Sequence, residues 1–371
     1  MISKDKFIAA VMLHALGDTI GFKNGQWEFY GQTEFIRTKR INYNLNNEML
    51  YEFINLGGIN NINLSNWFVS DDTLLHIDLM QAYSKTSNLQ QVIKLIIAKF
   101  IKTKQKYYDA TVNINRQFGI TTIKSIQSYE KSSEHNYQND YDDFGGGNGA
   151  AMRNICIGLV FNDKKNINDL IEHSIQTSKL THNNPIGFLG GLTTSFFTQL
   201  AINNTNINEW PFKLLELLKS SNVMKYITTS CETKDYNKFV GYWHKYVDAK
   251  FDDSKNPITK RSHANLQWRT QFHYDNFSDP SLESMAGANG CSVNIMAYDA
   301  LLDSQNVWEK LVIYSMIHIG DSDTVGAIAG GWYGALNGFQ NIPQGNMEFV
   351  EFKSKLQKLA LNLYDKYAHH K

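Results

Sequence analysis

The sequence predicts an all-α protein, and two observations support this prediction. Apolar residues recur at the 3.6-residue period of a buried helix face along most of the 371 residues, whereas the alternating pattern of half-buried strands is scarce. The chain also contains only 5 prolines, and a proline inside a helix removes a hydrogen bond and costs about 3 kcal/mol. Long helices are therefore expected along the whole chain.

The apolar stripes predict the helices in order. The first run, Phe7 to Leu16, is about as long as the core of a signal peptide. A buried helix is the better interpretation, because His14 interrupts the run and Gly17 to Gly21 stands where a cleavage site should be. The remaining stripes predict helices at 74–80, 92–97, 155–160, 186–202, 212–218, 293–302, 307–319, 324–336 and 349–364.

Composition excludes several classes of protein. The 36 Lys+Arg and 36 Asp+Glu give a formal net charge of zero, and binding to nucleic acid or an anionic membrane surface needs clustered positive charge. No apolar run approaches the roughly 20 residues of a membrane helix. Three widely spaced cysteines, Cys156, Cys231 and Cys291, fit a reducing compartment. We expect a cytoplasmic monomer with no nucleic-acid and no membrane partner.

Residues 1–371 are predicted to form one domain. The sequence contains no internal repeat at solenoid periods and no Gly/Ser linker long enough to separate two domains. A polar segment around 220–284 separates two motif-bearing halves, and we interpret it as an insertion in one fold. Asparagine-rich stretches at 42–47, 136–143 and 203–208 are expected as surface loops.

The first chemical signal lies at a predicted helix start, in Ser70-Asp71-Asp72-Thr73 before Leu74. A serine or aspartate before a helix commonly caps the free N–H groups of its first turn. One cap needs one such residue, whereas four consecutive side chains here carry oxygen. The surplus favours a cation site, and capping alone is the alternative.

The second signal, Asp321-Ser322-Asp323-Thr324, also opens a predicted helix. That helix carries Gly326, Gly330 and Gly334 at four-residue spacing. A glycine inside a helix costs about 1 kcal/mol relative to alanine, which is tolerable where a neighbouring backbone must approach closely. The pattern predicts a tightly packed central helix with two aspartates at its tip.

If the two tips meet, Asp71, Asp72, Asp321 and Asp323 share one partly buried site, and neither motif contains Lys or Arg. Unpaired carboxylates in a low dielectric either take up protons or bind cations. Hard oxygen ligands suit Mg²⁺, Mn²⁺ or Ca²⁺, and four carboxylates match two divalent ions. Such a two-metal centre can activate water and stabilise a departing atom.

A third signal is the glycine-rich stretch from Phe144 to Arg153, immediately before a predicted helix. Such a loop presents bare N–H groups to an anion and lets its backbone approach the ligand. It lacks the Gly-Lys-Ser/Thr ending of a P-loop, and no strand precedes it as a dinucleotide-binding fold would require. An anion site and a flexible loop are both left open.

Three single residues complete the candidates. Glu28 stands between two aromatic residues, where burial could raise its pKa toward general acid–base use, although a solvated glutamate is the alternative. His182 could bind a ligand or simply cap a helix end. His76, one turn after Asp72, is expected in the core.

Together these segments resemble the ADP-ribosylglycohydrolases, most closely the branch that acts on ADP-ribosyl-arginine. The resemblance covers nearly the whole chain and keeps its order. It rests on Gly17-Asp18, Asn24 to Phe29, Val69 to Thr73, Gly146 to Arg153 with Cys156 to Leu159, Thr181-His182, Ala297 to Ala300 and Gly320 to Thr324.

The resemblance implies an orthogonal helical bundle and an enzyme with two Mg²⁺ ions, or Mn²⁺ in their place. It implies hydrolysis of the N-glycosidic bond between ADP-ribose and arginine in modified proteins, with Glu28 beside the reacting ribose and Glu28 or Asp72 accepting a proton from water. Carried over by position, the metal ligands are Ser70, Asp71, Asp72, Asp321, Asp323 and Thr324. Likewise, the contacts to ADP-ribose, the product, are Gly146, Gly147, Asn148, Gly149, Met152, His182 and Ser284.

The sequence departs from the family pattern in two places. Lys23 follows Phe22 where the arginine branch has two aromatics. Met285 replaces a tryptophan, and Gly290 to Asn294 replaces Gly-His-Asp-Ala-Pro. An inactive ADP-ribose-binding relative and a hydrolase of another linkage, such as serine, are therefore the alternatives.

Two other enzyme classes use aspartate-rich motifs, and neither fits. The all-α terpene synthases need the third acid of D-D-x-x-D, which Asp71 to Leu75 lacks. The haloacid-dehalogenase-type phosphatases need a strand before their Asp-x-Asp motif, whereas Asp321 follows a helical stretch.

Overall fold

The computed structural model describes residues 2–38, 40–110, 115–132, 140–278 and 285–368. The all-α prediction is confirmed: in these ranges two isolated bridges are present and no strand. The helices are α1 (Lys4–Phe22), α2 (Gln32–Thr38), α3 (Leu45–Asn55), α4 (Gly58–Asn61), α5 (Asp71–Tyr83), α6 (Leu89–Tyr107), α7 (Ile120–Lys131), α8 (Ile155–Val160), α9 (Ile167–Lys179), α10 (Pro185–Ile202), α11 (Trp210–Leu218), α12 (Ser221–Met224), α13 (Ser230–Lys250), α14 (Leu266–Phe277), α15 (Ser292–Ser304), α16 (Trp308–Met316), α17 (Ser322–Asn337), α18 (Gln344–Glu348) and α19 (Lys353–Tyr367).

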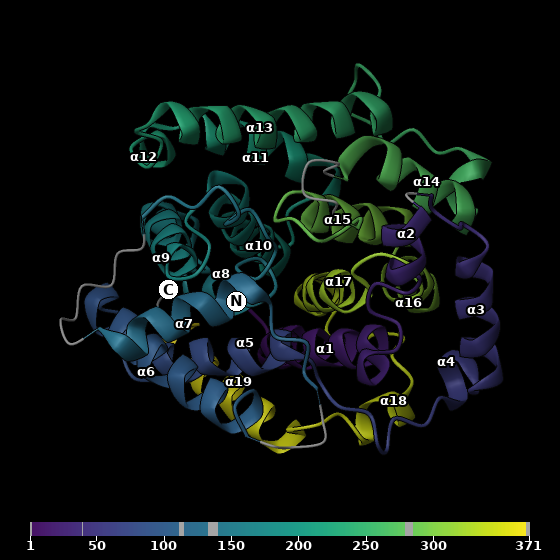
Figure 1. The fold of residues 1–371 in the computed structure, drawn as a ribbon, viewed down its shortest axis with the longest axis horizontal. Coiled ribbons are helices and arrows are strands. Elements are labelled where there is room, and N and C mark those ends of the chain that lie inside the picture. The colour runs from purple at the N-terminus through teal and green to yellow at the C-terminus, as the bar shows by residue number, and fades with distance from the viewer. Residues whose placement is uncertain (1, 39, 111–114, 133–139, 279–284, 369–371) are drawn as a thin grey trace.

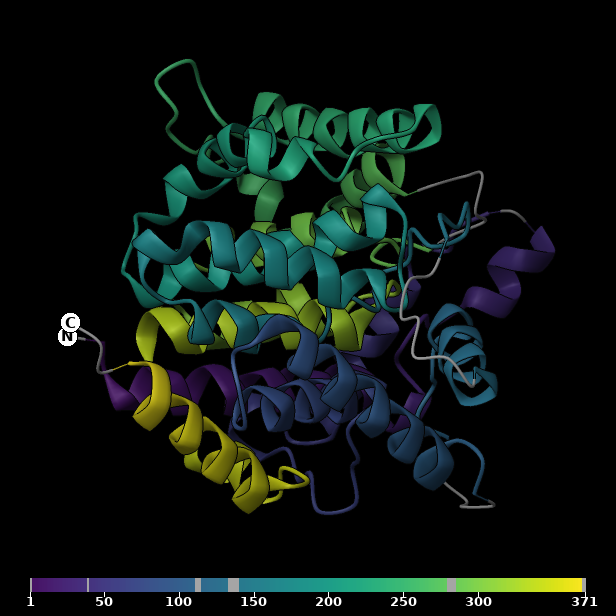
Figure 2. The same cartoon turned by 90° about the vertical axis from the view of Figure 1, so that its left-hand side faces the viewer.

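Helices α1 and α17 lie in the middle of the molecule, with the other helices around them (Figure 1), and Figure 2 shows the two helices running side by side. A Cβ built on Gly17 would lie 2.1 Å from the carbonyl oxygen of Gly326, and one built on Gly330 would lie 2.2 Å from that of Leu13. These pairs run in opposite directions along the two helices, so α1 and α17 are antiparallel. The close backbone approach expected from the glycine spacing of α17 is confirmed.

The same contact explains why α1 is longer than predicted. Gly17 and Gly21 continue the helix, and a Cβ on Gly21 would lie 2.2 Å from the carbonyl oxygen of Ser322. The small residues of α1 therefore belong to the contact face with α17 rather than to a loop. This pairing brings the C-terminal end of α1 beside the N-terminal tip of α17.

An aromatic cluster joins the central pair to the helices above it in Figure 1. The ring of Phe197 on α10 lies 5.2 Å from Trp210, 5.6 Å from Trp243, 5.6 Å from Tyr298 and 5.2 Å from Trp332, measured between centroids. These rings come from α11, α13, α15 and α17. Aromatic pairs of this kind add about 0.5–1.5 kcal/mol each beyond their buried area.

The polar segment around 220–284 is tied to α15 by buried charges. Asp299 pairs with Lys250 at 2.8 Å, with Arg269 at 2.5 Å and with His273 at 3.4 Å. The pKa of Asp299 lies well below its usual range, because two buried cations outweigh the burial of its carboxylate. Helices α13 and α14 thus pack on the core through both aromatic and ionic contacts.

Several boundaries differ from expectation. Residues 42–47 are not wholly a loop, because α3 begins at Leu45 and the buried Asn46 side chain accepts a hydrogen bond from Thr270 at 3.1 Å. Part of the stretch 136–143 lies outside the described residues. Helix α19 begins only after Phe352, whose φ of 58° is left-handed and interrupts the predicted run. No described helix combines the length and apolar character needed to cross a membrane.

Candidate active site

The first acidic tip is the N-terminus of α5, which two residues cap together. Ser70 Oγ accepts the backbone N–H of Asp72 at 3.2 Å. The buried Asp18 of α1 accepts the backbone N–H groups of Ser70 and Thr73 at 2.9 and 3.1 Å, and the hydroxyl of Thr73 at 2.5 Å. Since these oxygens satisfy the first turn of α5, Asp71 and Asp72 are available for another role.

The second acidic tip is the N-terminus of α17, capped by Asp321. Its carboxylate accepts the backbone N–H of Thr324 at 3.3 Å, and its own N–H donates to the carbonyl of Ala286 at 2.9 Å. Asn148 Nδ2 donates to Asp321 Oδ2 at 2.6 Å. The glycine-rich loop is therefore bonded directly to the second tip.

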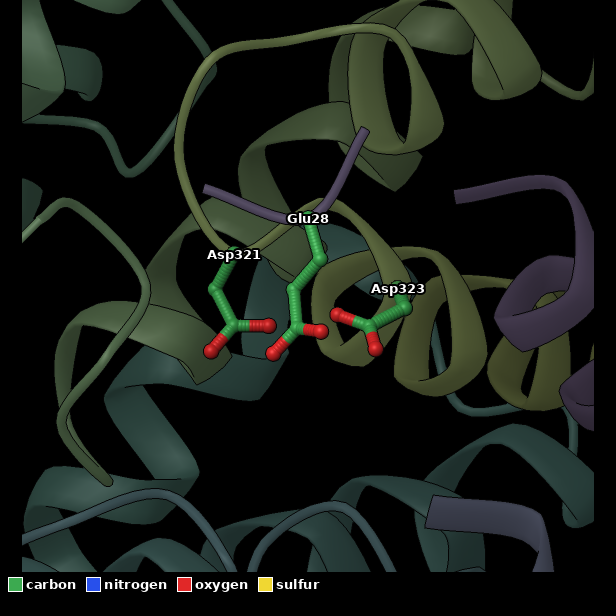
Figure 3. A group of neighbouring side chains, drawn as sticks. All are labelled: Glu28, Asp321 and Asp323. Atoms are coloured by element: carbon green, nitrogen blue, oxygen red, sulfur yellow. The ribbon is translucent and has the colours of Figure 1, made fainter. Parts of the chain in front are cut away.

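Glu28 joins the second tip from the loop after α1. Ligand oxygens of Glu28, Asp321 and Asp323 all lie within 4.8 Å of one another, and Figure 3 shows the three carboxylates side by side. The backbone N–H of Phe29 donates to the carbonyl of Gly320 at 3.0 Å, which fixes this loop against the segment that leads into α17. Glu28 is partly exposed as a residue, but its Oε2 is buried and finds no hydrogen-bond partner among the described residues.

The carboxyl groups of both tips lie close together in a buried site, which disfavours their negatively charged forms. Burial raises the pKa of Glu28, Asp72 and Asp323 well above the usual carboxyl range, and neighbouring carboxylates raise it further. Asp72 raises the pKa of Asp323, and Asp321 raises that of Asp72, so the two tips belong to one electrostatic site. Asp72 Oδ2 is also buried without a hydrogen-bond partner in the described part of the chain. Hard oxygens in this state fit a divalent cation.

The loop that carries Glu28 is held in a strained conformation. Lys23, Asn24 and Phe29 have φ values of 43°, 57° and 51°, in the left-handed region that non-glycine residues rarely adopt. Trp27 Nε1 donates to Glu52 Oε2 at 2.8 Å, and the Lys23 ammonium pairs with Glu52 and lies 4.8 Å from the centre of the Trp27 ring. Lys23, Trp27 and Glu52 thus form a clamp that positions Glu28.

We expect Glu52→Ala to lower the free energy of unfolding by about 1–3 kcal/mol. The substitution leaves the ammonium of Lys23 and the indole N–H of Trp27 without their acceptor. Glu48→Ala, one turn earlier on α3, is the matched control, because Glu48 meets the loop only through a 3.5 Å contact with Tyr30. Urea denaturation measures the loss, and equal free energies of unfolding for the two variants would contradict the clamp.

The glycine-rich loop is fixed from the far side by the segment after residue 285. The backbone N–H of Asn148 donates to Ala288 at 3.1 Å, and the N–H of Gly290 donates to Gly146 at 3.0 Å. The loop is therefore a held structure rather than a flexible connection. Gly149 has no room for a side chain, because its Cβ would lie 2.6 Å from the His182 ring.

His182 belongs to a hydrogen-bonded relay beneath this loop. The buried Arg153 donates to the hydroxyl oxygen of Thr181 at 2.8 Å, so the hydroxyl hydrogen is left for His182 Nδ1 at 2.7 Å. Burial and the positive charge of Arg153 lower the pKa of His182 to about 3. The neutral ring then carries its hydrogen on Nε2, the nitrogen that faces Gly147 and Gly149.

A cavity of about 320 Å³ brings most of the predicted site residues together. The predicted residues that line it are Glu28, Asp71, Asp72, Gly147, Asn148, Gly149, Met152, His182, Asp321 and Thr324. Carboxylates and the glycine-rich loop therefore face the same space.

Three of the predicted residues that the structure describes do not line this cavity. Ser70 caps α5, Asp323 faces Glu28 and Asp321, and Gly146 packs against Ile186. Ser284 lies outside the described residues.

The segment that departs from the family pattern lies away from the cavity. Met285 is buried, with its sulfur 3.5 Å from the Tyr274 hydroxyl, and a Cβ on Gly290 would touch the backbone of Ile186. Neither residue lines the cavity. Met285 packs against Tyr274, whose hydroxyl also contacts the carbonyl of Ile319 just before the second tip.

Sequence reasoning missed two parts of the site. Residues 117–122, from Gln117 to Thr122, line one wall of the cavity, but no motif distinguishes them. Asp18 was visible only as part of a resemblance, and its capping of α5 depends on a contact across 52 residues of sequence. Neither role has a local signal.

The fold is all-α, and its polar cavity joins a carboxylate cluster to a glycine-rich loop, an arrangement suited to an anionic ligand held together with cations. The chain belongs to the ADP-ribosylglycohydrolase family, whose model matches residues 2–371. It is thus related to glycohydrolases of the ADP-ribosylhydrolase type.

Individual relatives agree with this assignment. The chain is 32% identical over 390 residues to ADP-ribosylhydrolase ARH1 of Dictyostelium discoideum, covering 97% of this chain and 93% of the relative. It is 35% identical over 363 residues to an Acanthamoeba polyphaga mimivirus protein provisionally named ADP-ribosyl glycohydrolase L444, covering 95% and 68%. A solved ADP-ribosylglycohydrolase-related protein complex contains a chain of similar fold, with a TM-score of 0.56, 17% identity and 98% of both chains covered.

Proposed function

We propose that this protein hydrolyses the N-glycosidic bond between ADP-ribose and an arginine side chain of a modified protein. The observation that carries the proposal is the single cavity in which buried carboxylate oxygens without hydrogen-bond partners face a fixed glycine-rich loop. The loop and the Nε2–H of His182 suit the diphosphate. The carboxylates suit a cationic leaving group such as a guanidinium.

The proposed cofactors are two Mg²⁺ ions, with Mn²⁺ as a substitute. Ser70, Asp71 and Asp72 from the first tip and Asp321, Asp323 and Thr324 from the second would hold them. Bound divalent cations would polarise water and the ribose hydroxyls and offset the negative charge of the site. The residues fit these ions, since all six offer hard oxygen donors and no Lys or Arg stands in either motif.

Carboxyl groups of the chain would transfer the proton during hydrolysis. Water adds its oxygen to the anomeric carbon as the carbon–nitrogen bond breaks, and Glu28 or Asp72 takes the proton that the water loses. The departing nitrogen gains the proton that this carboxyl group took up, so the products are arginine and free ADP-ribose. Glu28 stands outside the six proposed ligands, and burial raises the pKa of its carboxyl group, which favours its taking up a proton.

A linkage panel tests the proposal. Arginine-linked and serine-linked ADP-ribosylated proteins are incubated with the purified chain, with Mg²⁺ or with EDTA, and released ADP-ribose is measured. We expect release from the arginine linkage with Mg²⁺ and a fall of at least about 10³-fold with EDTA, corresponding to about 4 kcal/mol of activation free energy. Release from the serine linkage alone would overturn the proposed arginine linkage. Full activity in EDTA would overturn the proposed dependence on cations. If neither substrate released ADP-ribose, the proposed enzymatic function would be wrong.

A further inference from the structure

A second cavity, of about 840 Å³, opens beside the first along the loop after α1 and along α2. The residues that line both cavities are Glu28, Phe29, Gln32 and Gln117. We call the larger one the α2 groove, lined by residues 25, 26, 28–34, 37 and 117. The two spaces therefore meet at Glu28.

The position of the loop gives the two cavities different roles. Gly147, Gly149 and His182 line only the smaller cavity. A ligand with its diphosphate on this loop and its reacting carbon at the carboxylates would extend its other end past Glu28. That end of the ligand is the leaving group, and the space beyond Glu28 is the α2 groove.

The α2 groove has the character of a surface for an extended chain. Sites for small molecules are mostly apolar and enclosed, whereas Gln32, Thr33, Glu34 and Arg37 are exposed polar residues of this groove. A polypeptide can exchange its hydrogen bonds to water for bonds to such side chains. Glu34 and Arg37 offer one exposed acidic and one exposed basic group in this groove, and Glu34 is the one that attracts a cationic segment.

We propose that the α2 groove binds the polypeptide segment around the modified residue, with Glu34 attracting the cationic side of that segment. This inference rests on the proposed function. It makes Glu34 a specificity-determining residue for protein substrates rather than a group that acts on the glycosidic bond.

The test compares two substrates with the same linkage, ADP-ribosyl-arginine as a small conjugate and an arginine-ADP-ribosylated polypeptide. We expect Glu34→Lys to lower kcat/KM for the polypeptide about tenfold, mainly through KM, and to change that of the small conjugate less than about twofold. For the polypeptide, the kcat/KM of Glu34→Gln should lie between those of the wild-type chain and Glu34→Lys. Glu216→Lys is the matched control, because this exposed glutamate lines a separate cavity on α11. Equal effects on both substrates, or no effect on either, would overturn the proposal.

A second measurement locates the polypeptide without depending on turnover. Cys231 is the exposed cysteine, whereas Cys156 and Cys291 are buried, so Cys231→Ser gives a background for placing one reactive thiol. A photo-reactive group on Arg37→Cys should cross-link the modified polypeptide, and excess ADP-ribose should suppress the product. The same group on Glu216→Cys should not.

The two failures are distinguishable. If the wild-type chain cleaves neither substrate, the proposed function fails, while the cross-linking result still decides the groove. Equal cross-linking at positions 37 and 216 would refute the groove even in a fully active enzyme.

Discussion

Gly17→Ala should destabilise the protein by at least about 3 kcal/mol, more than most single substitutions. The added methyl group would lie 2.1 Å from the carbonyl oxygen of Gly326, and no side-chain rotation relieves a clash with backbone. Helices α1 and α17 would have to separate along their whole contact, and overpacking of a rigid core costs about 1–3 kcal/mol even where side chains can shift. Urea denaturation followed by circular dichroism measures the loss.

Gly241→Ala is the matched control for this prediction. Gly241 is also a helical glycine, on α13, but a Cβ there meets nothing within 4 Å. The same substitution should stabilise the protein by about 0.5–1 kcal/mol, because alanine loses less backbone entropy in a helix. If Gly17→Ala and Gly241→Ala shifted the denaturation midpoint alike, the close antiparallel contact would be wrong.

The central helix pair also shows how far the sequence predicts the fold. The four-residue spacing of Gly326, Gly330 and Gly334 predicted that some backbone approaches α17, and it does. The spacing of small residues identifies a contact face of α17 but not the helix that packs against it. The sequence therefore predicts a first helix that ends before Gly17 and Gly21. Only the packed structure shows that the two sets of glycines lie against each other.

The sequence also predicts only part of the candidate site. The aspartates of both tips and the glycine-rich loop were predictable, because helix N-termini and glycine loops have local signatures. The clamp on Glu28 was not, since Lys23 and Glu52 lie 29 residues apart and no sequence motif connects them. Asp299 likewise gave no hint that Lys250 and Arg269 would pair with it.

Asp323→Asn should abolish hydrolysis while making the cation-free protein more stable. Activity should fall about 10³-fold or more, since a charged ligand of the proposed cations contributes several kcal/mol to the transition state. Stability should rise, because the substitution removes one of several buried negative charges that repel each other. Asp72→Asn should behave in the same way, since Asp72 has an oxygen without a hydrogen-bond partner in the described residues.

The stability of the cation-free protein should depend on pH. Carboxyl groups with a raised pKa hold protons in the folded state that they release in the unfolded state, so stability falls as pH rises from the ordinary carboxyl pKa through the raised one. For Asp18, where burial raises the pKa from 3.8 to about 6, that window lies between these two values. For Glu28, Asp72 and Asp323 it extends higher. Between pH 5 and pH 8, the cation-free melting temperature of the wild-type chain should therefore fall by about 2 °C or more relative to that of Asp323→Asn, since the buried histidines with lowered pKa act alike in both proteins.

Added Mg²⁺ should reverse this fall in the wild-type chain and not in Asp323→Asn, as measured by thermal denaturation with and without EDTA. Asp78→Asn is the matched control, because Asp78 is a buried carboxyl group on α5 whose pKa burial raises to about 6, and it bonds to Thr103 rather than facing the cavity. It should also relieve a buried charge, yet keep both the activity and the Mg²⁺ response. A Mg²⁺ response that survived in Asp323→Asn would show that the cations bind elsewhere, since stabilisation by a ligand requires that the folded state bind it.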